Sequence, residues 1–247
     1  MPILADDDSM EQHKPVNGFA FSATKIQNLG ATEYTLFGLA ADKSGSVWNF
    51  AQEITACVKS VIESCQRSPR ADNLMARVMA FNHHADEIHG FKPLSDCHLG
   101  NYDGVIVPGG MTALYDTTVN LVDSLAVYGK SLIANDYSVN GIIVVVTDGC
   151  DEGSTLSAKN VKASLERAMQ NEALESLVSI LIGVNVTEAH VEKKLQAFKD
   201  EAGFTQYVQT ADATPKTLAK LAGFISKSVS SQSQSLGTKA ASQPITF

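Results

Sequence analysis

Oxygen-bearing side chains recur in this sequence where apolar runs end. Asp42, Ser44 and Ser46 crowd into DKSGS, directly after the apolar run YTLFGLA. Thr112 follows the loop PGGM, and Asp148 follows the apolar run GIIVVVT. All five side chains present hard oxygen, which Mg²⁺ prefers, and none is the cysteine or histidine that a softer metal favours. The residue types therefore point to a cation site, although Asp and Ser are also common helix caps.

The elements that would position these residues alternate between strands and helices. Apolar runs predict strands at 34–41, 74–81, 141–147 and 177–184, and shorter strands at 87–91 and 207–208. Helical spacing of apolar residues predicts helices over 46–66, 112–133, 157–171, 187–202 and 214–228. Continuous buried strands joined by helices are typical of parallel sheets. The sequence therefore predicts an α/β fold with a doubly wound, mostly parallel central sheet and helices on both faces.

Such a sheet would gather the oxygen-bearing residues at one place. Ligands of open parallel sheets bind outside the carboxyl ends of the strands, where the strand order reverses. Asp42 and Asp148 each follow a predicted strand, and Thr112 opens a predicted helix. We therefore expect these residues to lie together at one edge of the sheet.

Three motifs in this order resemble the von Willebrand factor A (vWA) family. DKSGS matches the family's D-x-S-x-S, GGMT with Thr112 resembles its threonine loop, and TDG with Asp148 resembles its second aspartate loop. The resemblance covers residues 34–228, and it implies a Rossmann-like vWA fold with a complete metal-ion-dependent adhesion site (MIDAS).

The resemblance also implies roles for these residues. Asp42 and Asp148 would hold the cation directly or through water, and Thr112 would join in the ligand-bound state. Ser44 and Ser46 would supply neutral hydroxyl oxygens. We expect Mg²⁺, with Mn²⁺ or Ca²⁺ as alternatives, and a coordination position left open for a Glu or Asp of another protein.

Other interpretations of the same residues are open or weaker. Ser44, Ser46 and Thr112 could cap helices, and we expect Ser46 to do so in any case. The segment 148–159 is a poor EF-hand loop, because Cys150 and Lys159 occupy positions that need oxygen ligands. The four histidines and one cysteine over 83–98 fit no standard zinc spacing. The sequence has neither a phosphate loop nor a G-x-S-x-G elbow. Asp151 and Glu152 read as solvated loop residues.

Composition restricts the partners. The chain has 247 residues, a net charge of −8 and no Lys/Arg cluster, which argues against nucleic acid or an anionic membrane as the main partner. The first residues lack the pattern of a signal peptide and no run reaches the length of a membrane span, so we expect a cytoplasmic protein. The four cysteines are expected to be reduced and mostly packed in the core.

The ends of the chain differ from its middle. Residues 1–33 are expected to form an N-terminal extension, poorly ordered up to Gly18, in which FAFSAT reads as a short edge strand. Residues 34–228 are expected to form a vWA-like domain. Residues 229–247 are rich in Ser and Gln and are expected to be a flexible tail, whose last residues, PITF, are apolar enough to dock.

The sequence therefore predicts a protein-binding adaptor that engages an acidic residue of its partner through Mg²⁺ and is not itself an enzyme. A ring ATPase of the MoxR class and a kinase–phosphatase signalling set are the partners that the resemblance suggests. One alternative is a metal-dependent hydrolase or phosphotransferase, although no histidine falls beside Asp42 or Asp148 to complete a nucleophile–base pair. The other is a structural protein that self-associates through the same site.

Overall fold

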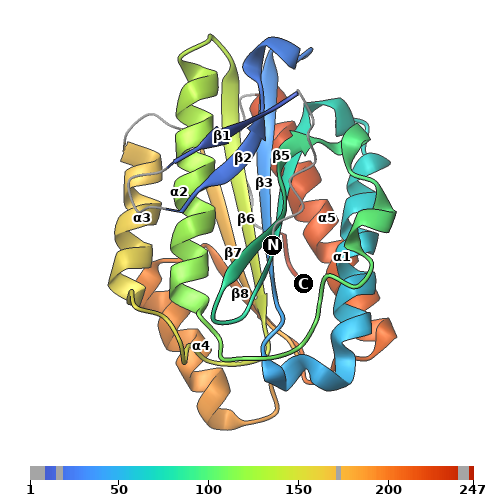
Figure 1. The fold of residues 1–247 in the computed structure, drawn as a ribbon, viewed down its shortest axis with the longest axis vertical. Helices are drawn as coiled ribbons and strands as arrows, with labels where there is room; N and C mark the ends of the chain where they lie inside the picture. Colours follow the sequence, from blue (N-terminus) through green and yellow to red (C-terminus); the bar gives the residue numbers. More distant parts are fainter. Residues whose placement is uncertain (1–8, 15–18, 171–173, 239–244) are drawn as a thin grey trace.

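The computed structural model describes residues 9–14, 19–170, 174–238 and 245–247, and it confirms the predicted fold class (Figure 1). Eight strands form one sheet in the order β1-β2-β5-β4-β3-β6-β7-β8. In chain order they are β1 Met10–His13, β2 Phe21–Thr24, β3 Glu33–Asp42, β4 Leu74–Phe81, β5 Ala85–Pro93, β6 Ser138–Thr147, β7 Leu177–Gly183 and β8 Gln206–Gln209. Strands β4, β3, β6, β7 and β8 run parallel to one another, whereas β5 is antiparallel to β4.

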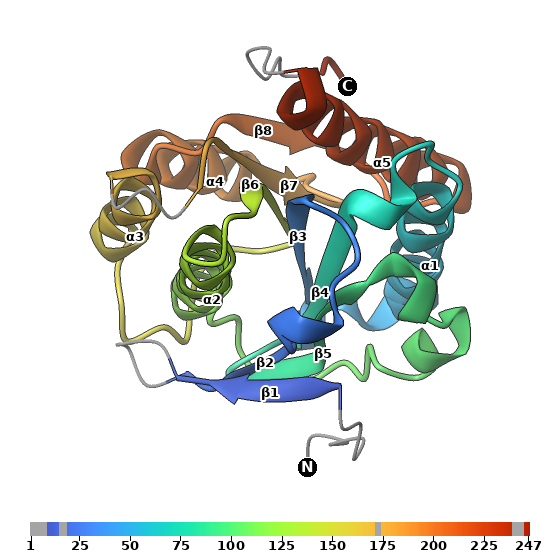
Figure 2. The same ribbon diagram turned by 90° about the horizontal axis from the view of Figure 1, so that it is seen from above.

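Helices cover both faces of the sheet. Figure 2 shows α1 and α5 packed together on one face and α2, α3 and α4 on the other. Their bounds are α1 Ala51–Gln66, α2 Leu114–Ile133, α3 Ala158–Gln170, α4 Ala189–Ala202 and α5 Pro215–Thr238. No helix within the described ranges is long and apolar enough to cross a membrane.

The central strands are apolar on both faces because both faces are covered. Along β3, Phe37 and Leu39 join the core beneath α1 and α5, while Leu36 and Ala40 join the core beneath α2. Side chains of a strand alternate between faces, so a strand covered on both sides must be apolar at every position. This is why the central strands read as continuous runs in the sequence.

The N-terminal segment contributes more to the sheet than its sequence predicts. Residues 10–13, expected to be poorly ordered, form β1 and pair with β2. FAFSAT contains β2, which lies between β1 and β5 rather than at the edge, so the predicted edge position is wrong. Phe21 is buried, and the ring of His13 stacks on it with a centroid separation of 5.0 Å. Residues 1–8 and 15–18 lie outside the described ranges.

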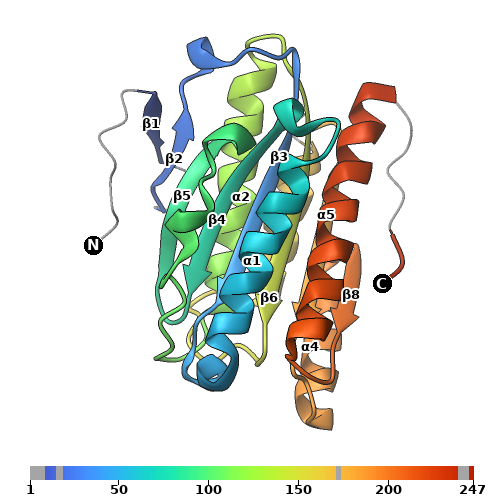
Figure 3. The same cartoon turned by 90° about the vertical axis from the view of Figure 1, so that its right-hand side faces the viewer.

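The last helix runs ten residues beyond its predicted end at Ser228. Helix α5 continues to Thr238, and Val229, Gln232 and Leu236 are buried, so the expectation of a flexible tail is wrong for residues 229–238 (Figure 3). The last described residues pack against β8 and α5. Gln206 Nε2 donates to Ile245 O at 3.0 Å, and the ring of Phe247 meets that of Phe224 edge-on. Residues 239–244 lie outside the described part.

Candidate metal site

The candidate site lies at the switch point of the sheet. Strands β3 and β6 are parallel neighbours, with Ala41 paired to Val146. Helix α1 follows β3 on one face, and α3 follows β6 on the other face (Figure 2). The connections that leave the carboxyl ends of β3 and β6 therefore diverge to opposite faces, which is where open parallel sheets bind ligands. Asp42 and Asp148 lie at these two ends.

Four of the five predicted residues form one hydrogen-bonded chain. Ser44 N donates to Asp42 Oδ1 at 2.7 Å. The hydroxyl oxygens of Ser44 and Ser46 are 3.0 Å apart, and Ser46 Oγ donates to Asp148 Oδ1 at 2.7 Å. The structure thus brings both carboxylates and both hydroxyl groups of the predicted set into one cluster.

Backbone hydrogen bonds fasten the loop of Thr112 to this cluster. Gly45 N donates to Gly110 O at 3.1 Å, and Gly109 N donates to Lys43 O at 2.9 Å. On the other side, Glu152 N donates to Thr112 O at 2.9 Å. The buried Thr112 is therefore held between the loop that follows β3 and the loop that follows β6.

Gly110 allows the Thr112 loop to approach in this way. Its φ is +77°, in the left-handed region that disfavours side chains, and a Cβ there would lie 2.2 Å from His83 Nδ1. Position 110 of the GGMT motif thus requires glycine both because of its positive φ and because a side chain would have no room.

Sequence reasoning missed several residues that build the site. Thr147 Oγ1 donates to Asp42 Oδ2 at 2.6 Å, so the residue before Asp148 orients the first carboxylate. Asn82, directly after β4, donates through Nδ2 to Gly109 O at 2.6 Å and holds the threonine loop. Thr147 ends β6 and Asn82 follows β4, so both lie at the carboxyl ends of parallel strands, and that position is the signal that could have identified them.

Asp151 is a structural residue and not only a solvated one. Asp151 Oδ1 accepts a hydrogen bond from Tyr115 N at 3.2 Å, and Ser154 Oγ accepts from Tyr115 N and from Asp116 N. These side chains satisfy backbone donors in the first turn of α2. They also tie the loop after β6 to the helix that follows Thr112.

The expectation that Ser46 and Thr112 cap helices is wrong, and Ser44, at the N-cap of a 3₁₀ segment, makes no capping hydrogen bond through its side chain. Helix α1 begins at Ala51, after a 3₁₀ segment over Gly45–Phe50, and Ser46 Oγ bonds to Asp148. Helix α2 begins at Leu114 with Ala113 at its N-cap. Ser46 and Thr112 therefore lie outside the helices that they were expected to cap.

The electrostatics of Asp42 fit a cation. Its side chain is 0% exposed, and its hydrogen-bond donors, Ser44 N and Thr147 Oγ1, are neutral. Burial raises the pKa of Asp42 to about 6, and the nearby Asp148 adds to the rise. The ammonium of the adjacent Lys43 pairs with Asp86 instead. A buried carboxylate without a positive partner is costly, so the donor set fits a hard divalent cation.

The sulfur and imidazole groups do not form a second centre. Cys57, Cys65 and Cys97 are buried, Cys150 is half-buried, and all four are free. Within the described ranges, no group of three or more His, Cys, Asp or Glu side chains is placed to hold a metal ion. The candidate site has two carboxylates, so a cation there would depend on hydroxyl and water oxygens.

The mostly parallel sheet with helices on both faces is consistent with a Rossmann-like vWA fold, and solved structures share this architecture. No protein-family model and no curated protein matches the chain. The PilB minor pilin from Streptococcus sanguinis matches 91% of this chain and 67% of its own, with a TM-score of 0.61 and 15% identity. The pilus adhesin SpaC from Lactobacillus rhamnosus GG matches 86% of this chain and 32% of its own, with a TM-score of 0.57 and 11% identity.

A third similar structure is described with a metal in the corresponding type of site. Proximal thread matrix protein 1 (PTMP1) from the mussel byssus, "with zinc occupied MIDAS motif", matches 82% of this chain. The match spans 47% of that chain, with a TM-score of 0.51 and 16% identity. At such identities these likenesses show the fold alone.

Proposed function

We propose that this chain is a protein-interaction module that engages an acidic residue of a partner through a divalent cation held by Asp42, Ser44, Ser46, Thr112 and Asp148. The observation that carries the proposal is the fully buried Asp42 carboxylate. Its partners are neutral donors, and it is linked through Ser44 and Ser46 to a second carboxylate. A carboxylate in this position needs a positive partner that the described chain does not supply.

Each residue of the set has a distinct task. Asp42 and Asp148 would provide the two negative charges that balance a divalent cation, and Thr147 keeps Asp42 oriented through its 2.6 Å hydrogen bond. Ser44 and Ser46 would add neutral oxygens. When bound, the cation would supply an electrophilic coordination position that a carboxylate of another protein can fill. The buried Thr112, on a separate loop, would join the site in the ligand-bound state.

Mg²⁺ or Mn²⁺ remains the expected cation, because the set contains only oxygen ligands. The zinc of PTMP1 makes a divalent metal plausible at a site of this type, but it leaves the identity of the ion here to experiment. Calorimetry on chelator-stripped protein, with Mg²⁺, Mn²⁺, Ca²⁺ and Zn²⁺ in turn, measures the preference.

The experiment that tests the proposal compares two carboxylates of the same neighbourhood. Asp42→Asn should abolish Mg²⁺ binding, whereas Asp86→Asn, whose carboxylate pairs with Lys43, should leave it unchanged. Partner capture in Mg²⁺ and in EDTA, followed by mass spectrometry, then identifies proteins whose binding needs the cation. Tight, stoichiometric Zn²⁺ binding that survives Asp42→Asn would contradict the proposed site, and capture that is equal in EDTA would contradict its role.

The remaining expectations stay predictions. An enzymatic role would need a nucleophile and base, and the groove beside the site is lined by Glu53, Lys59 and Asp103 without histidine or cysteine. A ring ATPase or kinase–phosphatase partner, self-association and a cytoplasmic location stay predictions. A particle mass that depends on concentration and falls in chelator would favour self-association.

A further inference from the structure

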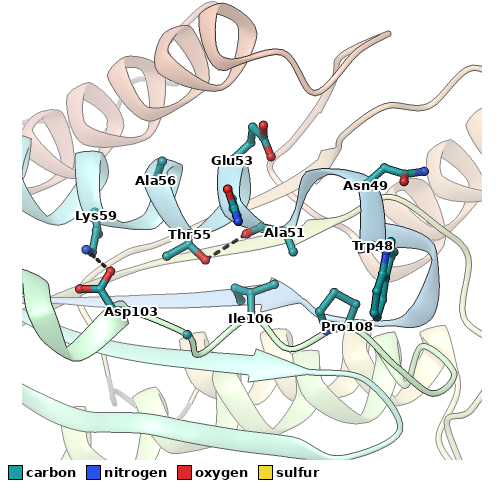
Figure 4. Close-up of a pocket in the computed structure, with 12 residues that line it drawn as sticks. Trp48, Asn49, Ala51, Glu53, Thr55, Ala56, Lys59, Asp103, Ile106 and Pro108 are labelled. Atoms are coloured by element: carbon teal, nitrogen blue, oxygen red, sulfur yellow. Dashed lines mark hydrogen bonds and ion pairs between the residues drawn. The ribbon is translucent and has the colours of Figure 1, made fainter.

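We propose that the groove beside the candidate metal site binds an extended segment of the partner, with a bulky apolar side chain a few residues from the acidic residue. This inference rests on the proposed function and names the partner's chemistry. The groove has a volume of about 740 Å³. Figure 4 shows it between the Trp48–Lys59 stretch on one side and the loop carrying Asp103, Ile106 and Pro108 on the other.

At one end, the groove is lined by residues that lie close in sequence to the candidate metal site. Trp48 and Pro108 line this end: Trp48 follows Ser46 by two residues, and Pro108 precedes Thr112 by four residues on the same loop. The hydrogen bond from Gly109 N to Lys43 O fastens the two walls where they meet the site. A chain whose carboxylate reached the cation would therefore find the groove next to it.

Exposed apolar side chains concentrate at the same end. Trp48 is 72% exposed, Val107 66% and Met111 53%. Among the described residues only two other large hydrophobic side chains are exposed, and both are less so: Phe247 at 48% and Met169 at 43%. Three of the five thus lie on the two loops around the site, and exposed apolar groups gathered in one place mark interaction surfaces. Tryptophan is also the residue most often found to dominate binding energy.

The dimensions and the polar lining fit an extended segment. From Ala51 to Lys59 the helix rises about 12 Å, which about four residues of extended chain would span. The ion pair between Lys59 and Asp103 closes the far end. Asn49 and Gln52 also line the groove, and their amides can bond to the exposed backbone of such a segment, which a helix would satisfy internally.

The experiment uses the full chain and random heptapeptides displayed on phage, selected in Mg²⁺. Selected peptides should carry Asp or Glu with an aromatic or large aliphatic residue two to four positions away. Trp48 is the only tryptophan, so peptide binding should shift its emission to the blue. Trp48→Ala and Ala56→Arg, which would fill the groove, should each weaken binding of a labelled peptide at least about tenfold. Met169→Ala, an exposed apolar residue on α3, is the matched control and should change nothing.

The outcomes separate this inference from the proposed function. Peptides that need Mg²⁺ and Asp42 but bind Trp48→Ala and Ala56→Arg normally would overturn the groove and leave the metal role intact. Peptides that need Trp48 but bind equally in EDTA would overturn the proposed function. A selection that yields no peptides, or only sequences without an acidic residue, overturns the inference. So does a particle mass that Trp48→Ala halves, because a second copy would then be the occupant.

Discussion

Two acidic side chains of the sheet obtain their stabilising partners in different ways. Glu87 on β5 has its own cation, because the buried Arg77 of β4 donates from Nε to Glu87 Oε2 at 2.7 Å. The other nitrogens of this guanidinium donate to Ser124 Oγ at 2.9 Å and to Asn120 Oδ1 at 3.1 Å. Burial lowers the pKa of Arg77 and the Glu87 charge opposes that change. This ion pair is complete within the chain.

Asp42 is buried at least as deeply but receives no such partner. Its two hydrogen-bond donors are neutral, and its acidic neighbour Asp148 adds repulsion. The difference indicates that one acidic group stabilises the fold, whereas the other is available to a ligand. Glu87 also accepts hydrogen bonds from Ser22 N and Ser22 Oγ, so the complete pair holds β2 to the sheet. Under the proposed function, a bound cation would neutralise the two aspartates.

Breaking the complete pair should have the largest effect. Arg77→Met leaves Glu87 without its cation and should lower the free energy of unfolding by about 3–5 kcal/mol. Urea unfolding measures this loss. Arg167→Met is the matched control, because the half-exposed Arg167 pairs with Asp123 at the surface and should cost less than about 1 kcal/mol. Equal losses for the two variants would remove the contrast on which the comparison depends.

Removing the charge of Glu87 and removing the charge of Asp42 should change the free energy of unfolding in EDTA in opposite directions. In EDTA, Glu87→Gln should destabilise the protein because it leaves Arg77 buried and unpaired, whereas Asp42→Asn should be at least as stable as the wild type. Mg²⁺ at about 100 times its Kd should stabilise the wild type by about 2.7 kcal/mol and leave Asp42→Asn unchanged. Thermal and urea unfolding with and without Mg²⁺ give these values. A large loss for Asp42→Asn in EDTA would show that Asp42, too, is structural.

Acid should weaken the region of the complete pair through His89. Burial, with Lys92 and Arg77 nearby, lowers the pKa of His89 to about 3. Its Nδ1 is 2.9 Å from Gly90 O, so Nδ1 carries the proton, and Nε2 accepts from the Tyr102 hydroxyl at 2.7 Å. Between pH 6.5 and 3 only the unfolded state binds the extra proton.

The stability that comes from neutral His89 is therefore complete above pH 6.5 and falls by about 1.4 kcal/mol per unit as the pH drops toward 3. Unfolding measured at pH 7.5, 6.5 and 5.5 tests the slope. His89→Gln should reduce it, and His190→Gln, which changes an exposed histidine on α4, should not. An unchanged slope in His89→Gln would assign the acid sensitivity to other groups.

The fold and the clustering of both aspartates with both serines could be predicted because strong local patterns determine them. The apolar runs of β3 and β6 require cover on both faces, and this places Asp42 and Asp148 at one edge. The end of α5 could not be predicted, because its buried face includes polar residues. Gln232 is buried among hydrogen bonds, with Nε2 3.1 Å from Gly141 O, and composition alone gives no sign of such long-range partners.

The smallest effect on stability should come from Ser46, and it distinguishes the two explanations of the serines. Ser46 is exposed and its hydroxyl bonds to Asp148, so Ser46→Ala should change the free energy of unfolding in EDTA by less than about 0.5 kcal/mol. If Ser46 is a cation ligand, Ser46→Ala should weaken Mg²⁺ binding about tenfold, which equals about 1.4 kcal/mol. A helix cap would instead cost about 1 kcal/mol of stability and leave Mg²⁺ binding unchanged.

Ser157→Ala is the control, because Ser157 lies directly before α3 and bonds to Asn160 Oδ1 at 2.7 Å. Calorimetry should therefore show a loss of Mg²⁺ affinity in Ser46→Ala, and urea unfolding should show a loss of stability in Ser157→Ala. A Ser46→Ala variant that loses stability but keeps its Mg²⁺ affinity would remove Ser46 from the metal site.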